Sequence, residues 1–302
     1  MIKSVTVTNH RDESLVMDLF NPFKNGMNIV GIDGIGPGKG TVNSVELYGL
    51  DGAVYNSARL GPRLITLSIN FLDSPDIETT RRRTYRYFPL KREVDLTFKT
   101  DARTLKIKGI VEGNEPDIFS KNEGTKITIQ CMDPYFDVVK DGGNDIVVFS
   151  NLAGGFSFPF SNTVGMSMIQ FGKFSYNTQT SLDYPGDIDT GVTIDIEAAF
   201  GPVTNPTVSN LETGQTMSIV TSNLPNKLTM SMGDTIRLTT ITGRKSIYHI
   251  RNGKETKALM ALAPGSEWIY MIPGMNVFSY SAQSGLENMS VSVHYDTKFS
   301  GV

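Results

Sequence analysis

Residues 233–295 read GDTIRLTTITGRKSIYHIRNGKETKALMALAPGSEWIYMIPGMNVFSYSAQSGLENMSVSVHY, and this stretch decides the fold class. Pairs that favour tight turns, namely Thr242-Gly243, Asn252-Gly253 and Pro273-Gly274, interrupt it at hairpin-like spacing. Between the turns, apolar and polar residues alternate, which is typical of strands that bury one face. The C-terminal half is therefore predicted to be a β-sandwich.

The N-terminal half shows the same period of two. Apolar and polar residues alternate along 65–71, 94–98, 105–108 and 127–129. One helix is expected between the first two of these strands. Its predicted features are Ser74 as N-cap, Pro75 at the first helical position, an ion pair between Glu78 and Arg82, an end before Pro89, and a buried stripe of Ile77, Tyr85 and Phe88.

Length and composition indicate a folded chain of two domains. The 302 residues exceed one average domain, and the polar, glycine-rich run KDGGND at 140–145 marks a boundary. We predict a first domain at 1–137, a linker at 138–145 and a second domain at 146–302. The fold class expected is mainly β, with one helix in the first domain.

Charge and cysteine usage exclude several functions. The net charge of −3 does not fit a protein that binds nucleic acid through its phosphates, so no specific nucleic-acid binding is expected. The chain shows no apolar run long enough to span a membrane and no secretory signal at its start. Cys131 is the single cysteine and fits a small buried residue in a strand.

No motif predicts a catalytic residue, a cofactor or a metal. The glycine-rich segment 32–41 has Asp33 where a phosphate-binding loop requires glycine, and Gly40 where it requires Ser or Thr. The aspartates around 183–189 lack the glycine and glutamate of a calcium loop. The three histidines are far apart in sequence and lack metal-type spacing. We therefore expect no enzymatic activity.

Two features remain as candidate contacts. Arg81, Arg82 and Arg86 form a basic cluster on the predicted helix, which is either a solvated face or a subunit interface. Trp268, close to Tyr270, fits either a residue of the sandwich core or a platform on which a sugar stacks.

The order of segments along the chain resembles the distal tail protein (Dit) family of phages, which are hub proteins of the tail or baseplate. The segments that carry this resemblance are DGAVYNSARL at 51–60, the strand to Phe71, the helix with TTRR at 79–82 and YFP at 87–89, CMDPYF at 131–136, the turns and strands of 233–295, and FSGV at 299–302.

The resemblance implies a structural protein of the virion tail, made in the cytoplasm of the host bacterium. Its first domain would form a belt that closes into a hexameric ring, and its second would be a galectin-like β-sandwich. The ring would join the tail tube protein to the tail-tip protein, and receptor-binding proteins would dock on it. Gly34, Gly36 and Lys39 would then contact a neighbour or the channel.

Two alternatives stay open at this stage. One is a carbohydrate- or receptor-binding module of a tail tip, with Trp268 as the sugar contact. Against it, the residues HIR at 249–251 lack the galectin spacing, and Glu267 precedes Trp268 instead of following it. The other alternative is a tail-tip hydrolase.

Overall fold

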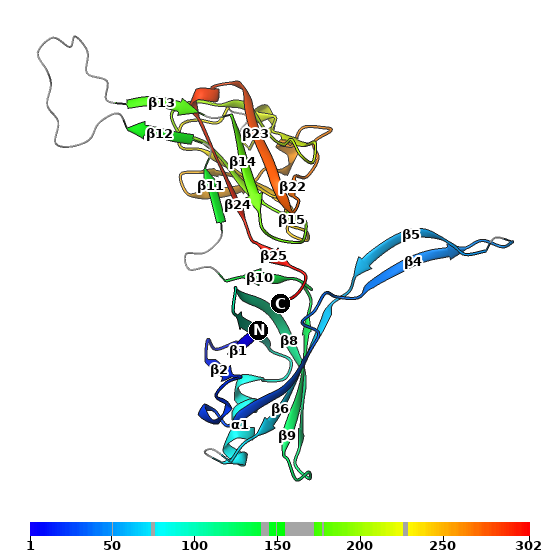
Figure 1. The fold of residues 1–302 in the computed structure, drawn as a ribbon. Helices are drawn as coiled ribbons and strands as arrows, with labels where there is room; N and C mark the ends of the chain where they lie inside the picture. Colours follow the sequence, from blue (N-terminus) through cyan, green and yellow to red (C-terminus); the bar gives the residue numbers. More distant parts are fainter. Residues whose placement is uncertain are drawn as a thin grey trace, which may run out of the picture. The chain divides into compact units, whose positions relative to one another are not determined.

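The chain folds into two compact units made mainly of antiparallel strands, which confirms the predicted fold class (Figure 1). The first unit is Met1–Gly143 with Lys298–Val302, and the second is Asn144–Thr297. The computed structural model describes residues 1–49, 51–73, 76–139, 145–148, 150–154, 172–176, 178–225 and 229–302.

The last five residues belong to the first unit, whereas the sequence analysis assigned them to the second domain. Strand β25 (Lys298–Phe299) pairs with β10 (Phe136–Val138), which also pairs with β8 (Thr104–Asp117). Such a return of the chain end has no local sequence signal, because it depends on pairing between strands that are distant in sequence.

The first unit is built on one antiparallel sheet with the strand order β2-β1-β7-β8-β9-β6-β3. Its alternating residues behave as predicted: Ile65, Leu67, Leu96 and Ile127 are fully buried in one core. The other strands of this path, with the short 3-10 helix η1 between β2 and β3, are β1 (Ile2–Asn9), β2 (Ser14–Asp18), η1 (Pro22–Lys24), β3 (Met27–Asp33), β6 (Arg63–Phe71), β7 (Glu93–Thr100) and β9 (Gly124–Cys131).

Helix α1 (Ile77–Tyr87) begins later than predicted. Its N-cap is Asp76, whose carboxylate accepts a hydrogen bond of 2.7 Å from the backbone N–H of Thr79. The predicted N-cap Ser74 and Pro75 lie outside the described residues. The predicted ion pair between Glu78 and Arg82 is confirmed, with a distance of 2.8 Å.

The buried stripe of α1 differs from the prediction. Thr80, Thr84 and Phe88 are buried and Ile77 is partly buried, whereas Tyr85 is 46% exposed. The four inward residues follow helical spacing. Tyr85 directly follows Thr84 in the helix, so its side chain points away from the core. At this turn of the helix the core is therefore contacted by the smaller Thr84 and not by the aromatic Tyr85.

Strands β4 (Gly40–Glu46) and β5 (Ala53–Leu60) form a separate two-stranded ribbon, here called the arm. The arm continues the hairpin that β3 and β6 begin, and Figure 1 shows it leading away from the sheet. Its strands pair only with each other among the described residues.

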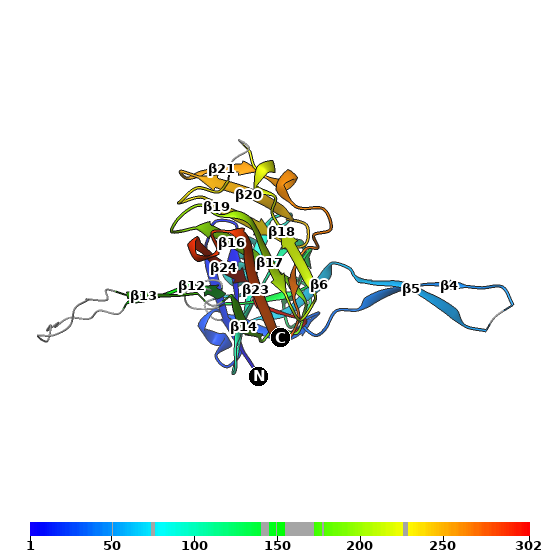
Figure 2. The same cartoon turned by 90° about the horizontal axis from the view of Figure 1, so that it is seen from above.

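The second unit is a β-sandwich, as predicted. One sheet has the order β11-β24-β16-β19-β20-β21 and the other has the order β14-β23-β17-β18, which Figure 2 shows as two layers. The rings of Tyr184 on β14 and Tyr295 on β24 meet edge to face, with centroids 5.9 Å apart, so one core joins the two sheets. Ile194, Ile236 and Val291 are fully buried in this core.

The strands of the sandwich and the smaller elements of the second unit are β11 (Asp145–Val148), β12 (Ser150–Gly154), β13 (Gly172–Tyr176), β14 (Gln179–Tyr184), β15 (Thr190–Gly191), β16 (Thr193–Ala198), β17 (Thr204–Asn210), β18 (Gln215–Ser218), η2 (Thr221–Asn223), β19 (Thr235–Thr239), β20 (Ser246–Arg251), β21 (Lys254–Lys257), η3 (Leu259–Ala261), β22 (Tyr270–Met271), β23 (Gly274–Ser284), η4 (Leu286–Asn288) and β24 (Met289–Tyr295). In the described part of the chain, no helix has the length and apolar character that crossing a membrane requires.

Candidate interaction surfaces

The predicted basic cluster on α1 is engaged within the chain. Arg82 pairs with Glu78, Arg81 lies 3.4 Å from Glu123, and Arg86 makes two hydrogen bonds of 2.5 and 2.9 Å to Glu13. Each charge thus has an acidic partner. The cluster therefore offers an interface less free positive charge than its sequence indicates.

The loop that contains the predicted contact residues Gly34, Gly36 and Lys39 is held in shape by Arg63. The buried Arg63 guanidinium donates to the carbonyls of Gly34 and Gly36, at 2.8 and 2.6 Å. Gly34 has a φ of +83°, and a Cβ placed there would lie 2.0 Å from the carbonyl oxygen of Leu64. Glycine at 34 is thus required by the fold of this loop, while Lys39 in the same loop is exposed to solvent.

The arm carries exposed apolar side chains on both of its strands and at its tip. Val42 and Tyr55 are 62% and 64% exposed, and Tyr48 at the tip is fully exposed. In the strand register, Val42 lies opposite Ala58 and Ser44 lies opposite Tyr55, so these side chains share one face of the ribbon.

Sequence reasoning missed the arm as a surface. β-Branched and aromatic residues favour a strand here, but Val42, Val45 and Val54 are all exposed, and the facing pair Val45–Val54 lies on the opposite face of the ribbon from Val42. Such a pattern cannot tell whether the covering surface belongs to the same chain or to a partner. An isolated two-stranded ribbon is at best marginally stable in water, so the arm is expected to gain stability from a partner.

Trp268 belongs partly to the sandwich core. It is half-buried against that core, and the ammonium nitrogen of Lys245 lies 5.4 Å from the centre of its ring. Together with Tyr270 and Asp189 it lines a pocket of about 220 Å³. Pockets that hold small organic ligands usually measure roughly 300–1,000 Å³, so this one is small for a sugar site.

A serine, a histidine and an aspartate meet on the outer face of the large sheet of the second unit. Ser292 Oγ lies 3.2 Å, and Asp195 Oδ2 3.7 Å, from the same nitrogen, Nε2 of His294. A catalytic triad needs the serine and the carboxylate on opposite ring nitrogens. Arg237 also holds the Asp195 carboxylate, with hydrogen bonds of 2.8 and 2.9 Å. This cluster therefore lacks the geometry of a nucleophilic site.

Metal-binding chemistry has no candidate in the described ranges of the chain, where no three residues among His, Cys, Asp and Glu are grouped to hold an ion. The aspartates near 183–189, which the sequence analysis assigned to a solvated turn, form no such group there.

Comparison with known proteins defines the fold. No protein-family model and no curated protein sequence matches this chain. The crystal structure of the Dit protein of phage SPP1, described as a paradigm of hub adsorption apparatus in phages that infect Gram-positive bacteria, is similar to it with 12% sequence identity and a TM-score of 0.63. That similarity covers 98% of this chain and 99% of the SPP1 chain.

The activated baseplate of phage P2, solved with Ca and with Sr, is also similar, at 12% and 11% identity and TM-scores of 0.41 and 0.40. Each of these matches covers 97% of this chain, and 98% and 97% of the respective baseplate chain. The SPP1 similarity carries the conclusion by itself: over nearly its full length, the chain has the fold of a Dit hub protein.

Proposed function

We propose that this chain is a structural hub protein of a phage tail tip or baseplate, located in the virion tail. The observation that carries the proposal is the full-length similarity to the SPP1 Dit hub protein, because it includes both units and not a common sandwich alone. The role proposed is assembly and not catalysis. The Ser292–His294–Asp195 geometry supports this, since it is unsuited to nucleophilic attack.

The ring is the finer part of the proposal. Six copies close around the tail channel through their first units, joining the tail tube protein to the tail-tip protein and offering docking sites to receptor-binding proteins. The arm supports self-association, because its exposed valines and tyrosines are covered by no part of the described chain. An arm that binds a different surface on the next copy makes a head-to-tail contact, and such contacts form a ring when the rotation between copies closes.

The free energy gained by burying the exposed side chains of the arm is large enough to affect association. Burying a side chain such as Val42 or Tyr55 contributes about 1.5–3 kcal/mol. The ladder of β4 and β5 sets which of these side chains face a partner together.

The test is sedimentation of the purified chain with a V42S/Y55S/Y48S variant. We expect the wild type to form a ring and the variant to associate at least ~10-fold more weakly, because three exposed apolar contacts are lost. The matched control is M260S, since Met260 is 84% exposed but lies on η3 of the second unit. If the arm variant assembled at the same protein concentration as the wild type, the proposed role of the arm would be contradicted.

A second, weaker proposal is recognition of a carbohydrate receptor by the second unit. It is supported by the pocket that Trp268, Tyr270 and Lys245 line, although the pocket is small. Saturable glycan binding that Trp268→Ala abolishes supports this proposal, and binding that Trp268→Ala leaves unchanged rejects it.

A further inference from the structure

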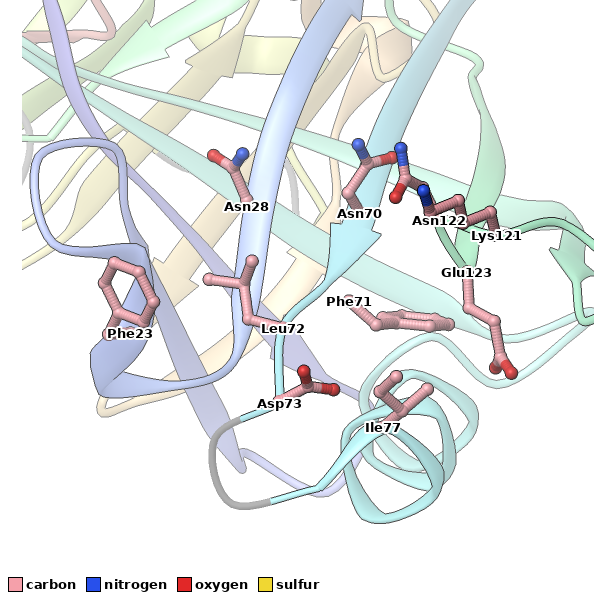
Figure 3. A pocket seen from close by; sticks show the side chains of 10 residues that line it. All are labelled: Phe23, Asn28, Asn70, Phe71, Leu72, Asp73, Ile77, Lys121, Asn122 and Glu123. Atoms are coloured by element: carbon pink, nitrogen blue, oxygen red, sulfur yellow. The ribbon is translucent and has the colours of Figure 1, made fainter.

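A pocket of the first unit lies where β6 ends and α1 approaches (Figure 3). Its volume of about 520 Å³ falls inside the range of pockets that hold small organic ligands, unlike the pocket at Trp268. The side chains that line it are Phe23, Asn28, Asn70, Phe71, Leu72, Asp73, Ile77, Lys121, Asn122 and Glu123.

Two asparagine amides form the polar wall of this pocket. Asn28 on β3 lies directly opposite Asn70 on β6, so their side chains point to the same face of the sheet. No hydrogen bond to either amide is found within the described part of the chain, and both residues are partly exposed to solvent. Each amide offers both a donor and an acceptor, which is the combination that a sugar hydroxyl group needs.

The neighbouring strand approaches β6 closely beside Asn70. The residue opposite Asn70 on β9 is Gly124, and a Cβ at that position would lie 3.0 Å from Asn70 Oδ1 and 2.6 Å from the carbonyl oxygen of Ile69. A larger residue at 124 would press on the amide and on the backbone of β6. Glycine at 124 is thus required by the close packing of these two strands.

Apolar side chains line another part of the same pocket. Phe23 follows β2 on the helix η1 and is 66% exposed, and Leu72 lies between it and Asn70 (Figure 3). An aromatic ring and hydrogen-bonding amides in one pocket suit a ligand with one apolar and one hydroxylated face.

The charges in the pocket balance one another. Glu123 is paired with Arg81 at 3.4 Å, so Asp73 and Lys121 remain as one negative and one positive charge. The pocket therefore holds no excess of positive charge to select a phosphate or carboxylate ligand. A neutral ligand fits this balance.

We propose that this pocket binds a short, neutral oligosaccharide. Asn28 and Asn70 would hold its hydroxyl groups, Phe23 would stack on a sugar ring, and Asp73 would accept a further hydroxyl hydrogen bond. The polar lining disfavours a second possible occupant, the apolar arm tip of another copy. This inference does not depend on ring formation.

The test uses the full-length chain on an array of neutral, acidic and aminated oligosaccharides, followed by calorimetric titration of the strongest neutral binder. We expect saturable binding in the neutral class. Asn70→Asp keeps the shape of the side chain but loses the amide donor, and should weaken binding roughly tenfold, as the loss of one good hydrogen bond does. Phe23→Ala should weaken it by a similar factor, with little effect on folding because Phe23 is exposed.

Trp268→Ala is the control and should bind like the wild type. A blank array for the wild type would overturn the proposal, as would preference for acidic oligosaccharides. Binding that Asn70→Asp and Phe23→Ala leave unchanged would also overturn it, and its loss in Trp268→Ala would move the site to the second unit.

Discussion

The Nη2 group of Arg63 donates a hydrogen bond of 2.6 Å to the backbone carbonyl of Ser300, a residue 237 positions away. The same guanidinium reaches Gly34 and Gly36 at the base of the arm, and Pro134 near β10. It also lies over the ring of Phe136, 4.7 Å from its centre. One buried side chain therefore ties the end of the chain to the point where the arm leaves the sheet.

Replacing Arg63 is expected to destabilise the first unit. Arg63→Ala removes four hydrogen bonds to carbonyls in a buried place, so the free energy of unfolding should fall by about 3 kcal/mol or more. Arg59→Ala on the exposed arm is the matched control and should change it little. Urea unfolding of both variants measures the difference. Equal stability of the two variants would contradict a central role for the Arg63 contacts.

Cys131 should report local opening around Arg63. The two residues are opposite each other in the pairing of β6 and β9, and burial raises the pKa of the Cys131 thiol to about 11. At pH 8 the native chain should therefore react with a thiol reagent very slowly, and Arg63→Ala should react faster. Rapid labelling of the native wild type would show that this region is open.

The stability that Glu13 contributes should depend on pH. Hydrogen bonds from Arg86, and then from Asn9, lower the pKa of Glu13 to about 2. A folded-state pKa below the unfolded value of roughly 4.3 contributes stability above that value, and the contribution is lost as the pH falls toward 2.

Glu13→Gln should therefore have a lower Tm than the wild type at pH 7, and the gap should close between about pH 4.3 and 2. The gap should also shrink in 1 M salt, since Arg86 is largely exposed and its charge is screened. Melting curves of both proteins across this range provide the measurement. If the difference in Tm between the two proteins did not change with pH, the effect of the substitution would come from packing and not from charge.

Asp234 should be important to the second unit. Burial by itself raises the pKa of Asp234, but hydrogen bonds from Arg251, at 2.8 and 2.5 Å, and from the backbone N–H of Ser231, together with the nearby positive charge, outweigh this effect and lower the pKa. Asp234→Asn leaves Arg251 without its anionic partner and should cost about 2 kcal/mol of unfolding free energy. Glu255→Gln, at an exposed pair with Arg237, should cost much less. Similar losses in the two variants would refute this ranking.

The parts of the fold that follow local periodicity could be predicted from the sequence. Residues 65–71 and 94–98 alternate and are buried as expected, and Glu78 pairs with Arg82. In each case the physical cause acts within a few residues of the chain. The helix start was predicted less well, because Ser74 and Asp76 are both residue types that favour the N-cap position, so residue type alone does not choose between them.

The surfaces proposed for function could not be predicted in the same way. Arg63 reads as an ordinary charged residue at the start of a strand, and its four carbonyl partners meet only in the folded chain. The pocket amides Asn28 and Asn70 are 42 residues apart and are joined by strand register alone. Such contacts depend on long-range pairing, for which a single sequence carries no signal.

The central claim is that this chain assembles into a ring, and the most direct measurement is its mass in solution combined with negative-stain imaging of the same sample. The account predicts particles of six chain masses that show six-fold symmetry and a central hole. A strict monomer across the accessible concentration range, both alone and mixed with its tail tube and tail-tip proteins, would contradict the account.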